Sequence, residues 1–242
     1  MHRRYGMRPH DWAFLAAIAF AGLGVAALMG GRVVWAIAAT VIAGAAAAAA
    51  RRWSRRYPGP MPYVLRSTLF LLPHAPAQLR RLLGPTDGER MLEIGPGVGH
   101  HALPIASALG PNGVLHVLDV QQEMLDALIR RARAAGISNI VAQQGDAQDL
   151  PYPDGMFDGA YLSAVLGEVP DQALALRELH RVLKPNGRLV VAEGCIDPDY
   201  INLATLRAEA GRAGFVLEKK LGSSVAYLAL FRAEKMPRRD PP

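Results

Sequence analysis

Three glycines at alternate positions follow a short apolar run in the middle of the chain. The run begins at Met91 and contains one acid, Glu93, and the glycines are Gly95, Gly97 and Gly99. A residue without a Cβ is needed where a strand turns sharply into a helix while its backbone lies against a bound molecule. The pattern predicts a ligand-binding loop, although a tight strand-to-helix turn without any ligand would use the same residues.

The spacing of these glycines disfavours a dinucleotide site. Counted from Gly95, the third glycine of the dinucleotide fingerprint would stand at position 100, where this chain has His100. An oxidoreductase that uses a nicotinamide or flavin cofactor is therefore the least favoured enzyme class.

A carboxylate follows the loop at the distance where nucleotide-binding folds hold a ribose. The apolar run from Val114 ends in Asp119, about 20 residues beyond the glycines. A carboxylate at the end of a strand can accept hydrogen bonds from both hydroxyls of a ribose. The loop and the acid together predict a ligand that contains a nucleoside.

The elements that must position these residues are strands alternating with helices. Apolar runs over 140–144, 157–162 and 187–193 predict three more strands, and helical periodicity follows Asp119 and Asp171, the second of which is a predicted N-cap. Such alternation predicts a mainly parallel sheet covered on both faces. The C-terminal part predicts a helix over 201–213 and a final strand pair over 215–219 and 224–232.

Taken together, these segments resemble the class I S-adenosylmethionine-dependent methyltransferases, particularly the branch that includes quinone-biosynthesis and small-lipid methyltransferases. The resemblance covers roughly residues 78–233, and its collinear motifs lie at 92–99, 118–125, 144–147, 150–152 and 178–187. It implies an α/β, Rossmann-like class I methyltransferase sheet, mostly parallel with an antiparallel last strand. It also implies S-adenosyl-L-methionine as the cofactor.

The resemblance further implies the cofactor-binding residues. The glycine loop would abut the methionine end of the cofactor, Glu93 would organise that loop and the cofactor amino group, Asp119 would hold the ribose, and Asp146 with Ala147 would meet the adenine edge. The full predicted set is Glu93, Gly95, Pro96, Gly97, Asp119, Val120, Gln121, Asp146, Ala147 and Ser163. One position departs from the branch, which often carries histidine immediately before the equivalent of Glu168, where this chain has Gly167.

Methyl transfer from a sulfonium is an in-line displacement, so alignment of the acceptor and exclusion of water can be the main contributions of the enzyme. An amine or phenol acceptor must still lose a proton, which a nearby base would take. The loops after the fourth and fifth strands face that point in this fold. The predicted catalytic residues are Glu193, the first choice because it ends a strand beside the cofactor, with Glu168 and Tyr161; further candidates are Ser163, Asp197, Asp199, Tyr200 and His74.

Composition narrows the class of partner. The chain has 242 residues, of which 51% are hydrophobic, a net charge of +6 and a single cysteine, Cys195. One cysteine excludes an internal disulfide and fits a reducing compartment. The arginines concentrate beside apolar segments instead of forming an aromatic-interleaved stripe, so a membrane surface is favoured over nucleic acid. The histidines and carboxylates lack the spacing of metal ligands, so no metal is predicted.

The first 56 residues predict a membrane hairpin. Two uncharged apolar runs, 13–29 and 33–50, are joined by a turn at Gly30 and Gly31, and each is close to the lower limit of about 17 residues for a bilayer-spanning helix. Arginines crowd the two outer ends, which predicts that both termini and the catalytic domain lie in the cytoplasm, at a bacterial-type inner membrane. The alternatives are a cleaved signal peptide and a buried helical pair.

Residues 57–77 are predicted to be a proline-rich linker followed by an amphipathic or lid segment. The apolar stretch 63–72 could lie in the membrane interface, cover the cofactor, or pack on the domain. The methyltransferase domain is predicted over 78–235 and a disordered tail over 236–242.

The sequence thus predicts a membrane-anchored methyltransferase whose acceptor is a lipid or lipophilic small molecule, such as a phospholipid amine or a quinone precursor. Two alternatives remain. The enzyme could methylate a soluble metabolite or a protein and be only located at the membrane, or the chain could be a catalytically silent binding or scaffold protein. The sequence indicates no oligomeric state.

Overall fold

The computed structural model describes residues 37–45, 76–195, 197 and 199–234. The chain divides into two compact units, Met1–Thr68 and Leu69–Pro242. In the first unit, residues 37–45 are helical. The rest of the two predicted membrane spans, the segment 57–75 and the tail 236–242 lie outside the described residues. Within the described ranges, no helix combines the length and apolar character that crossing a bilayer requires.

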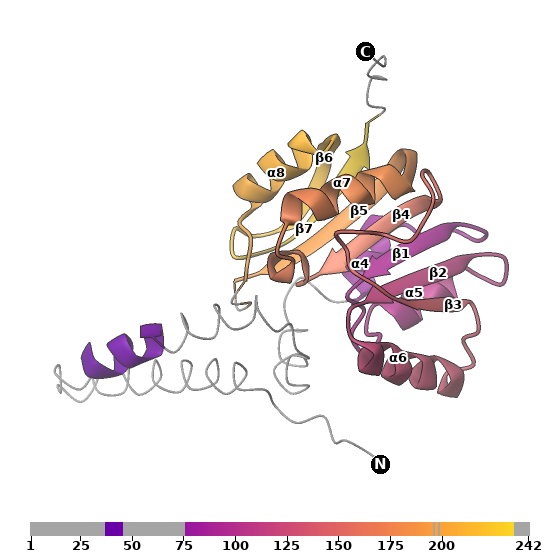
Figure 1. Cartoon of the computed structure of the whole chain (residues 1–242), viewed down its shortest axis with the longest axis horizontal. Helices are drawn as coiled ribbons and strands as arrows, with labels where there is room; N and C mark the ends of the chain where they lie inside the picture. The colour runs from indigo at the N-terminus through magenta and orange to yellow at the C-terminus, as the bar shows by residue number, and fades with distance from the viewer. Residues whose placement is uncertain (1–36, 46–75, 196, 198, 235–242) are drawn as a thin grey trace. The chain divides into compact units, whose positions relative to one another are not determined.

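The second unit is built on one sheet, in which the described strands follow the order β3-β2-β1-β4-β5-β7-β6 (Figure 1). The strands are β1 Arg90–Ile94, β2 Val114–Asp119, β3 Ile140–Gln144, β4 Phe157–Ser163, β5 Leu183–Gly194, β6 Phe215–Gly222 and β7 Ala226–Ala233. Neighbours from β3 to β5 are parallel, while β7 is antiparallel to both β5 and β6. This arrangement confirms the predicted sheet, mostly parallel with an antiparallel last strand.

Helices cover both faces of the sheet because its central strands are apolar on both sides. The helices are α4 Pro76–Leu83, α5 Ala102–Ala108, α6 Gln122–Ala134, α7 Gln172–Val182 and α8 Leu203–Arg212. Leucines of α4 and α6 share one core with Val190 of β5. Leu176 of α7 and Leu206 of α8 share the other core with Val191, the next residue of β5. Figure 1 shows α7 and α8 together over one face of the sheet.

Side-chain caps mark the starts of α7 and α8. The Asp171 carboxylate accepts a hydrogen bond from the Leu174 N–H at 2.8 Å, which confirms Asp171 as the N-cap of α7. Asn202 does the same for Thr205 at 3.0 Å, so α8 begins at Leu203, two residues later than predicted. The first predicted end strand is longer in the structure, because its backbone pairing continues to Gly222. The second begins two residues later than predicted, at Ala226, and ends one residue later, at Ala233.

Strand β5 begins four residues before the predicted start. It includes Lys184-Pro185-Asn186, which lie before the predicted strand, and Asn186 has a φ of 63°. The pairing of β5 with β4 is irregular there, since its register shifts between Phe157 and Gly159. Asparagine tolerates the left-handed conformation better than most residues do, so a turn is built into the start of the strand.

The connection from β3 to β4, residues 145–156, contains no helix. Its fold is held by a short bridge between Asp146 and Asp149 and by a ring cluster in which Tyr152 packs edge-on against His116 and Phe157. Burial and the nearby Arg90 lower the pKa of His116, so this histidine stays neutral.

Arg181 of α7 fastens this connection to the domain. Its guanidinium donates to the backbone oxygens of Tyr152 at 2.7 Å and Leu150 at 2.9 Å, and to the carboxylates of Asp154 at 2.8 Å and Glu178 at 2.6 Å. The hydrogen bonds from Arg181 lower the pKa of the Glu178 carboxyl. A planar guanidinium can satisfy several acceptors at once, which a lysine ammonium cannot do in the same geometry.

We therefore expect Arg181→Lys to destabilise the domain although the charge is kept. Losing several charge-assisted bonds should cost about 2 kcal/mol, which lowers the melting temperature by roughly 4–8 °C for a domain of this size. Thermal unfolding followed by circular dichroism measures the shift. Arg177→Lys, an exposed change on the same helix, is the control. Equal melting temperatures for the two variants would contradict the role given to Arg181.

Candidate active site

The carboxyl ends of the parallel strands meet at one edge of the sheet. Ile94, the last residue of β1, pairs with Leu118 of β2 on one side and Leu162 of β4 on the other. Ser163, the last residue of β4, pairs with Ala192 of β5. The loops that leave β1, β2, β4 and β5 are therefore neighbours, and in open α/β sheets the crevice outside these ends is where ligands bind.

The turn after β1 has a backbone that favours glycine. Gly95, Gly97 and Gly99 have φ values of 64°, 52° and 88°, in a region that residues with a Cβ rarely adopt. A Cβ on Gly95 would also lie 2.5 Å from Cγ2 of Val165, which is too close for any side chain.

The same turn is tied into the sheet by its own backbone. The Gly95 N–H donates to the Leu118 oxygen of β2 at 2.8 Å, and the Gly99 N–H donates to the oxygen of buried Pro96 at 2.9 Å. Helix α5 begins at Ala102, so Pro104 lies in its first turn, where no intrahelical donor is needed. The predicted strand-to-helix bend is thus present, and backbone hydrogen bonds hold it to the sheet.

Glu93 and Tyr161 form a buried pair beneath the bend. Both side chains are inaccessible or nearly so, with exposures of 3% and 0%, and the Tyr161 hydroxyl donates to Oε2 of Glu93 at 2.8 Å. Burial, reinforced by the Glu93 charge, raises the pKa of Tyr161 well above its ordinary value. Tyr161 therefore stays protonated and its hydroxyl is committed to holding the Glu93 carboxylate.

Asp119 ends β2 with a carboxylate that is 7% exposed and already oriented. Its Oδ1 accepts from the Gln121 N–H at 2.9 Å. The next residue, Val120, presents an apolar side chain that is 46% exposed, and its backbone oxygen is fixed by the Gln144 side chain at 3.0 Å. A fixed carboxylate beside an exposed aliphatic surface fits a ribose with a base next to it, so these residues suit the predicted cofactor.

Asp146 and Ala147, the two residues predicted at the adenine edge, differ in exposure and in hydrogen bonding. The exposed Asp146 carboxylate accepts from the backbone N–H and the side-chain amide of Gln148, at 2.9 and 3.0 Å. Ala147 is 4% exposed and its methyl group packs in the core.

The chain turns sharply after β4. Half-buried Ser163 is followed by Ala164, which has a φ of 53°, and its N–H donates to the Ala192 oxygen of β5 at 2.9 Å. A left-handed conformation at a residue with a Cβ costs about 1–2 kcal/mol and is typical of functional sites. Sequence reasoning missed Ala164, because alanine carries no signal for such a backbone. The 3-10 turn η1, Leu166–Glu168, follows, and Glu168 at its end is half-buried.

Glu193, near the end of β5, lies under the loop that follows the strand. It is 1% exposed, and its Oε2 accepts from the Ile201 N–H at 3.3 Å. Burial first, and then the charges of buried Asp197 and Asp199, raise the pKa of the Glu193 carboxyl well above its ordinary value. The Tyr227 hydroxyl donates to the Ile201 oxygen at 2.7 Å, so the same loop residue is held from two sides.

The departure at Gly167 has a steric cause. A Cβ at this buried position would lie 1.9 Å from the backbone oxygen of Asp199. A histidine here would therefore collide with the loop after β5.

Tyr200 and His74 are two further predicted candidates. The Tyr200 hydroxyl donates to the Ser224 oxygen at 2.5 Å in the β6–β7 turn, and His74 lies outside the described residues. Among the described residues, no cluster of three or more histidine, cysteine or acidic side chains could hold a metal ion.

Comparison with known proteins agrees with this geometry. A family model described as "Methyltransferase domain" matches residues 85–226. A demethylmenaquinone methyltransferase of Geobacillus kaustophilus is 35% identical over 113 residues, which are 47% of this chain and 48% of that protein. A similar enzyme of Staphylococcus aureus is 33% identical over 111 residues, 46% of this chain and 45% of that protein. The chain thus spans about half the length of the curated relatives it matches.

A solved structure has the same fold. A SAM-dependent methyltransferase from Aquifex aeolicus superposes with a TM-score of 0.61 at 20% identity, covering 69% of this chain and 92% of that one. Because the family model covers more than half of the chain, the protein belongs to the methyltransferase-domain family, which confirms the predicted enzyme class, a methyltransferase.

Proposed function

We propose that this protein is a membrane-anchored methyltransferase that methylates a lipophilic acceptor, with a quinone-type precursor favoured over a phospholipid amine. The observation that carries the choice of acceptor is the similarity to demethylmenaquinone methyltransferases, which extends over about half of the chain. The support for anchoring is in the sequence, where two uncharged apolar runs over 13–29 and 33–50 precede the domain. Tethering would raise the local concentration of an acceptor that resides in the membrane.

S-adenosylmethionine supplies an electrophilic methyl group on its sulfonium. In the proposed mechanism, Asp119 accepts hydrogen bonds from the ribose, and the bend from Gly95 to Gly99 lets the backbone approach the methionine end. Glu93, fixed by Tyr161, keeps that bend in place. The domain's contribution to rate is alignment and exclusion of water.

A proton must leave a phenolic or enolic acceptor as the new bond to the methyl carbon forms. Of the three predicted catalytic residues, Tyr161 and Glu193 are enclosed, whereas Glu168 is half-buried at the end of η1. We therefore favour Glu168 as the group that takes the proton. Tyr161 and Glu193 then act as positioning residues, the first for the glycine bend and the second for the loop at Ile201.

Asp119→Asn should weaken cofactor binding while leaving the fold intact. Replacing a carboxylate by a neutral amide removes charge-assisted hydrogen bonds to the ribose, about 1.5–3 kcal/mol, or roughly 10- to 100-fold in the dissociation constant. Isothermal titration calorimetry with S-adenosylmethionine measures it. Asp126→Asn, an exposed acid on α6, is the control. If the unmodified protein fails to bind the cofactor, or both variants bind it equally well, the catalytically silent alternative is favoured.

Glu193→Gln should change the pH dependence of stability. Since folding raises the pKa of Glu193, the protonated form is favoured in the native state. The stability that this preference contributes is complete below the pKa of glutamate in the unfolded chain, about 4.3. It is lost as the pH rises toward the higher pKa of Glu193 in the native state. The variant should therefore gain stability relative to the unmodified protein as the pH rises from about 4 to 8. Urea unfolding across this range measures the difference, with exposed Glu123→Gln as the control.

A comparison of Glu168→Gln with Glu193→Gln separates a catalytic role from a positioning role. Glu168→Gln should lower kcat by about 100-fold, the lower end for loss of a general base, with cofactor affinity unchanged. Glu193→Gln should retain most of kcat. A constant stability difference across pH would contradict the protonated state of Glu193, and a larger loss of kcat in Glu193→Gln than in Glu168→Gln would reverse their roles.

The acceptor class is tested with S-adenosylmethionine labelled in its methyl group. The full chain is incubated with reduced demethylmenaquinone in vesicles, and separately with the same naphthoquinol lacking its isoprenoid tail. We expect label in the lipid phase and much slower labelling of the tail-less compound. Equal rates for both would favour a soluble acceptor, and label confined to other water-soluble products or to protein would contradict the proposal.

A further inference from the structure

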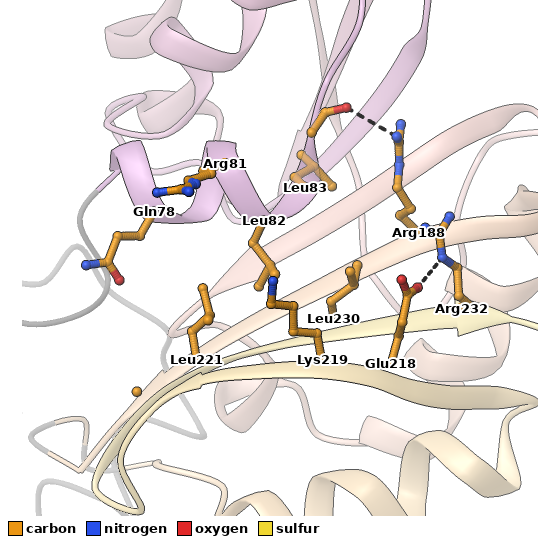
Figure 2. Close-up of a pocket in the computed structure, with 12 residues that line it drawn as sticks. Gln78, Arg81, Leu82, Leu83, Arg188, Glu218, Lys219, Leu221, Leu230 and Arg232 are labelled. Carbon is orange, nitrogen blue, oxygen red and sulfur yellow. Dashed lines mark hydrogen bonds and ion pairs between the residues drawn. The ribbon is translucent and has the colours of Figure 1, made fainter.

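A groove of about 850 Å³ lies between α4 and the strand pair β6/β7 (Figure 2). This volume is within the range of about 300–1,000 Å³ that is usual for small-molecule sites. All of its lining residues are described, and none of them belongs to the predicted cofactor-binding or catalytic set. The groove is therefore a different place from the candidate active site.

The floor of the groove is aliphatic. Leu82 comes from α4, Leu221 from β6 and Leu230 from β7, and Figure 2 shows these side chains in the space between the helix and the strands. The pairing of β6 with β7 puts Lys219 opposite Leu230, so Lys219 and Leu221 point to the same side as Leu230. Aliphatic surface of this kind gains free energy when a hydrocarbon chain covers it.

Two cations at the groove make no hydrogen bond or close ion pair with the described side chains, although, after the hydrogen bond from Arg232, the charge of Lys219 helps to lower the pKa of the neighbouring Glu218 carboxyl. Two other arginines are neutralised: Arg188 pairs with Glu89 at 2.5 Å, and Arg232 pairs with Glu218. Arg81 of α4 and Lys219 of β6 are both exposed, and neither makes a hydrogen bond or ion pair with any described side chain. In Figure 2 the Lys219 side chain extends from β6 toward α4. The uncompensated charge at the groove is positive.

The two ends of the chain outside the described domain have few acids to offer these cations. The sequence from 12 to 86, which leads into α4, contains no aspartate or glutamate, and residues 235–242 contain one acid against three bases. An anion that occupies the groove is therefore expected to come from another molecule. Because the floor is aliphatic, the best complement is a molecule with both an anionic head and a hydrocarbon chain.

We propose that the groove binds an anionic membrane lipid, with its phosphate-bearing head between Arg81 and Lys219 and an acyl chain along Leu82, Leu221 and Leu230. This site does not depend on methyl transfer. It would hold the domain to acidic lipid through α4 and the β6 edge, apart from any anchor in the N-terminal residues.

The test is calorimetry on the full chain in neutral-detergent micelles, titrated with lysophosphatidylglycerol. The double variant Arg81→Gln/Lys219→Gln removes both groove cations. Its matched control is Arg80→Gln/Lys220→Gln, with the same loss of charge at adjacent residues; Lys220 pairs with Ala229 and so faces the opposite side of the sheet. Lysophosphatidylcholine, which has no net charge, tests the contribution of the acyl chain alone. Inorganic phosphate tests the contribution of the anionic group alone.

We expect saturable binding of lysophosphatidylglycerol that weakens roughly tenfold in the groove variant, as the loss of two surface charge contacts implies, and that is unchanged in the control. Binding to lysophosphatidylcholine and to inorganic phosphate should be much weaker. The proposal is overturned if the full chain does not bind the anionic lipid, if both variants lose affinity equally, or if phosphate alone binds as tightly. None of these outcomes depends on methyl transfer, so the proposed enzymatic function stands or falls separately.

Discussion

The left-handed bend at the end of β1 is the constraint on which the candidate site depends. Gly95 has a φ of 64°, has no room for a Cβ beside Val165, and donates its N–H to Leu118 of the neighbouring strand. A side chain here would have to displace Val165 in the loop after β4. The bend therefore couples three strand ends, and these are the strand ends that would surround a nucleoside and its reactive group.

Buried acids stabilise this arrangement in different ways. Glu93 lies under the bend and accepts a hydrogen bond from the hydroxyl of Tyr161, whereas Asp119 lies at the end of β2 and has one carboxylate oxygen oriented by the Gln121 N–H. Glu193 is enclosed among other acids, and its pKa is raised. An acid with an oriented oxygen at a strand end suits recognition of a ligand, whereas an acid enclosed by neighbouring side chains suits support of the fold. The three acids share the same carboxyl group, so it is the surroundings of each one in the fold that indicate its role.

Much of the fold could be predicted because its signals are local. The strand-to-helix bend, the N-cap at Asp171 and the alternation of strands with helices each depend on a few adjacent residues. The features that the sequence does not predict depend on contacts between residues that are distant in sequence. Arg181 fastens a loop about 30 residues away, Ala164 takes a conformation that its neighbours impose, and Gly167 is explained only by the carbonyl of Asp199. Likewise, the burial of Glu193, which shifts the preferred base to Glu168, arises from the loop packed over it.

The central claim is that the bend and Asp119 together hold the nucleoside part of S-adenosylmethionine. A crystal structure of the full chain with S-adenosylhomocysteine tests it most directly. The claim predicts electron density across the carboxyl ends of β1 and β2, with both ribose hydroxyls within hydrogen-bond distance of the Asp119 carboxylate. Density for the nucleoside in the groove beside α4, or a ribose that does not touch Asp119, would contradict it.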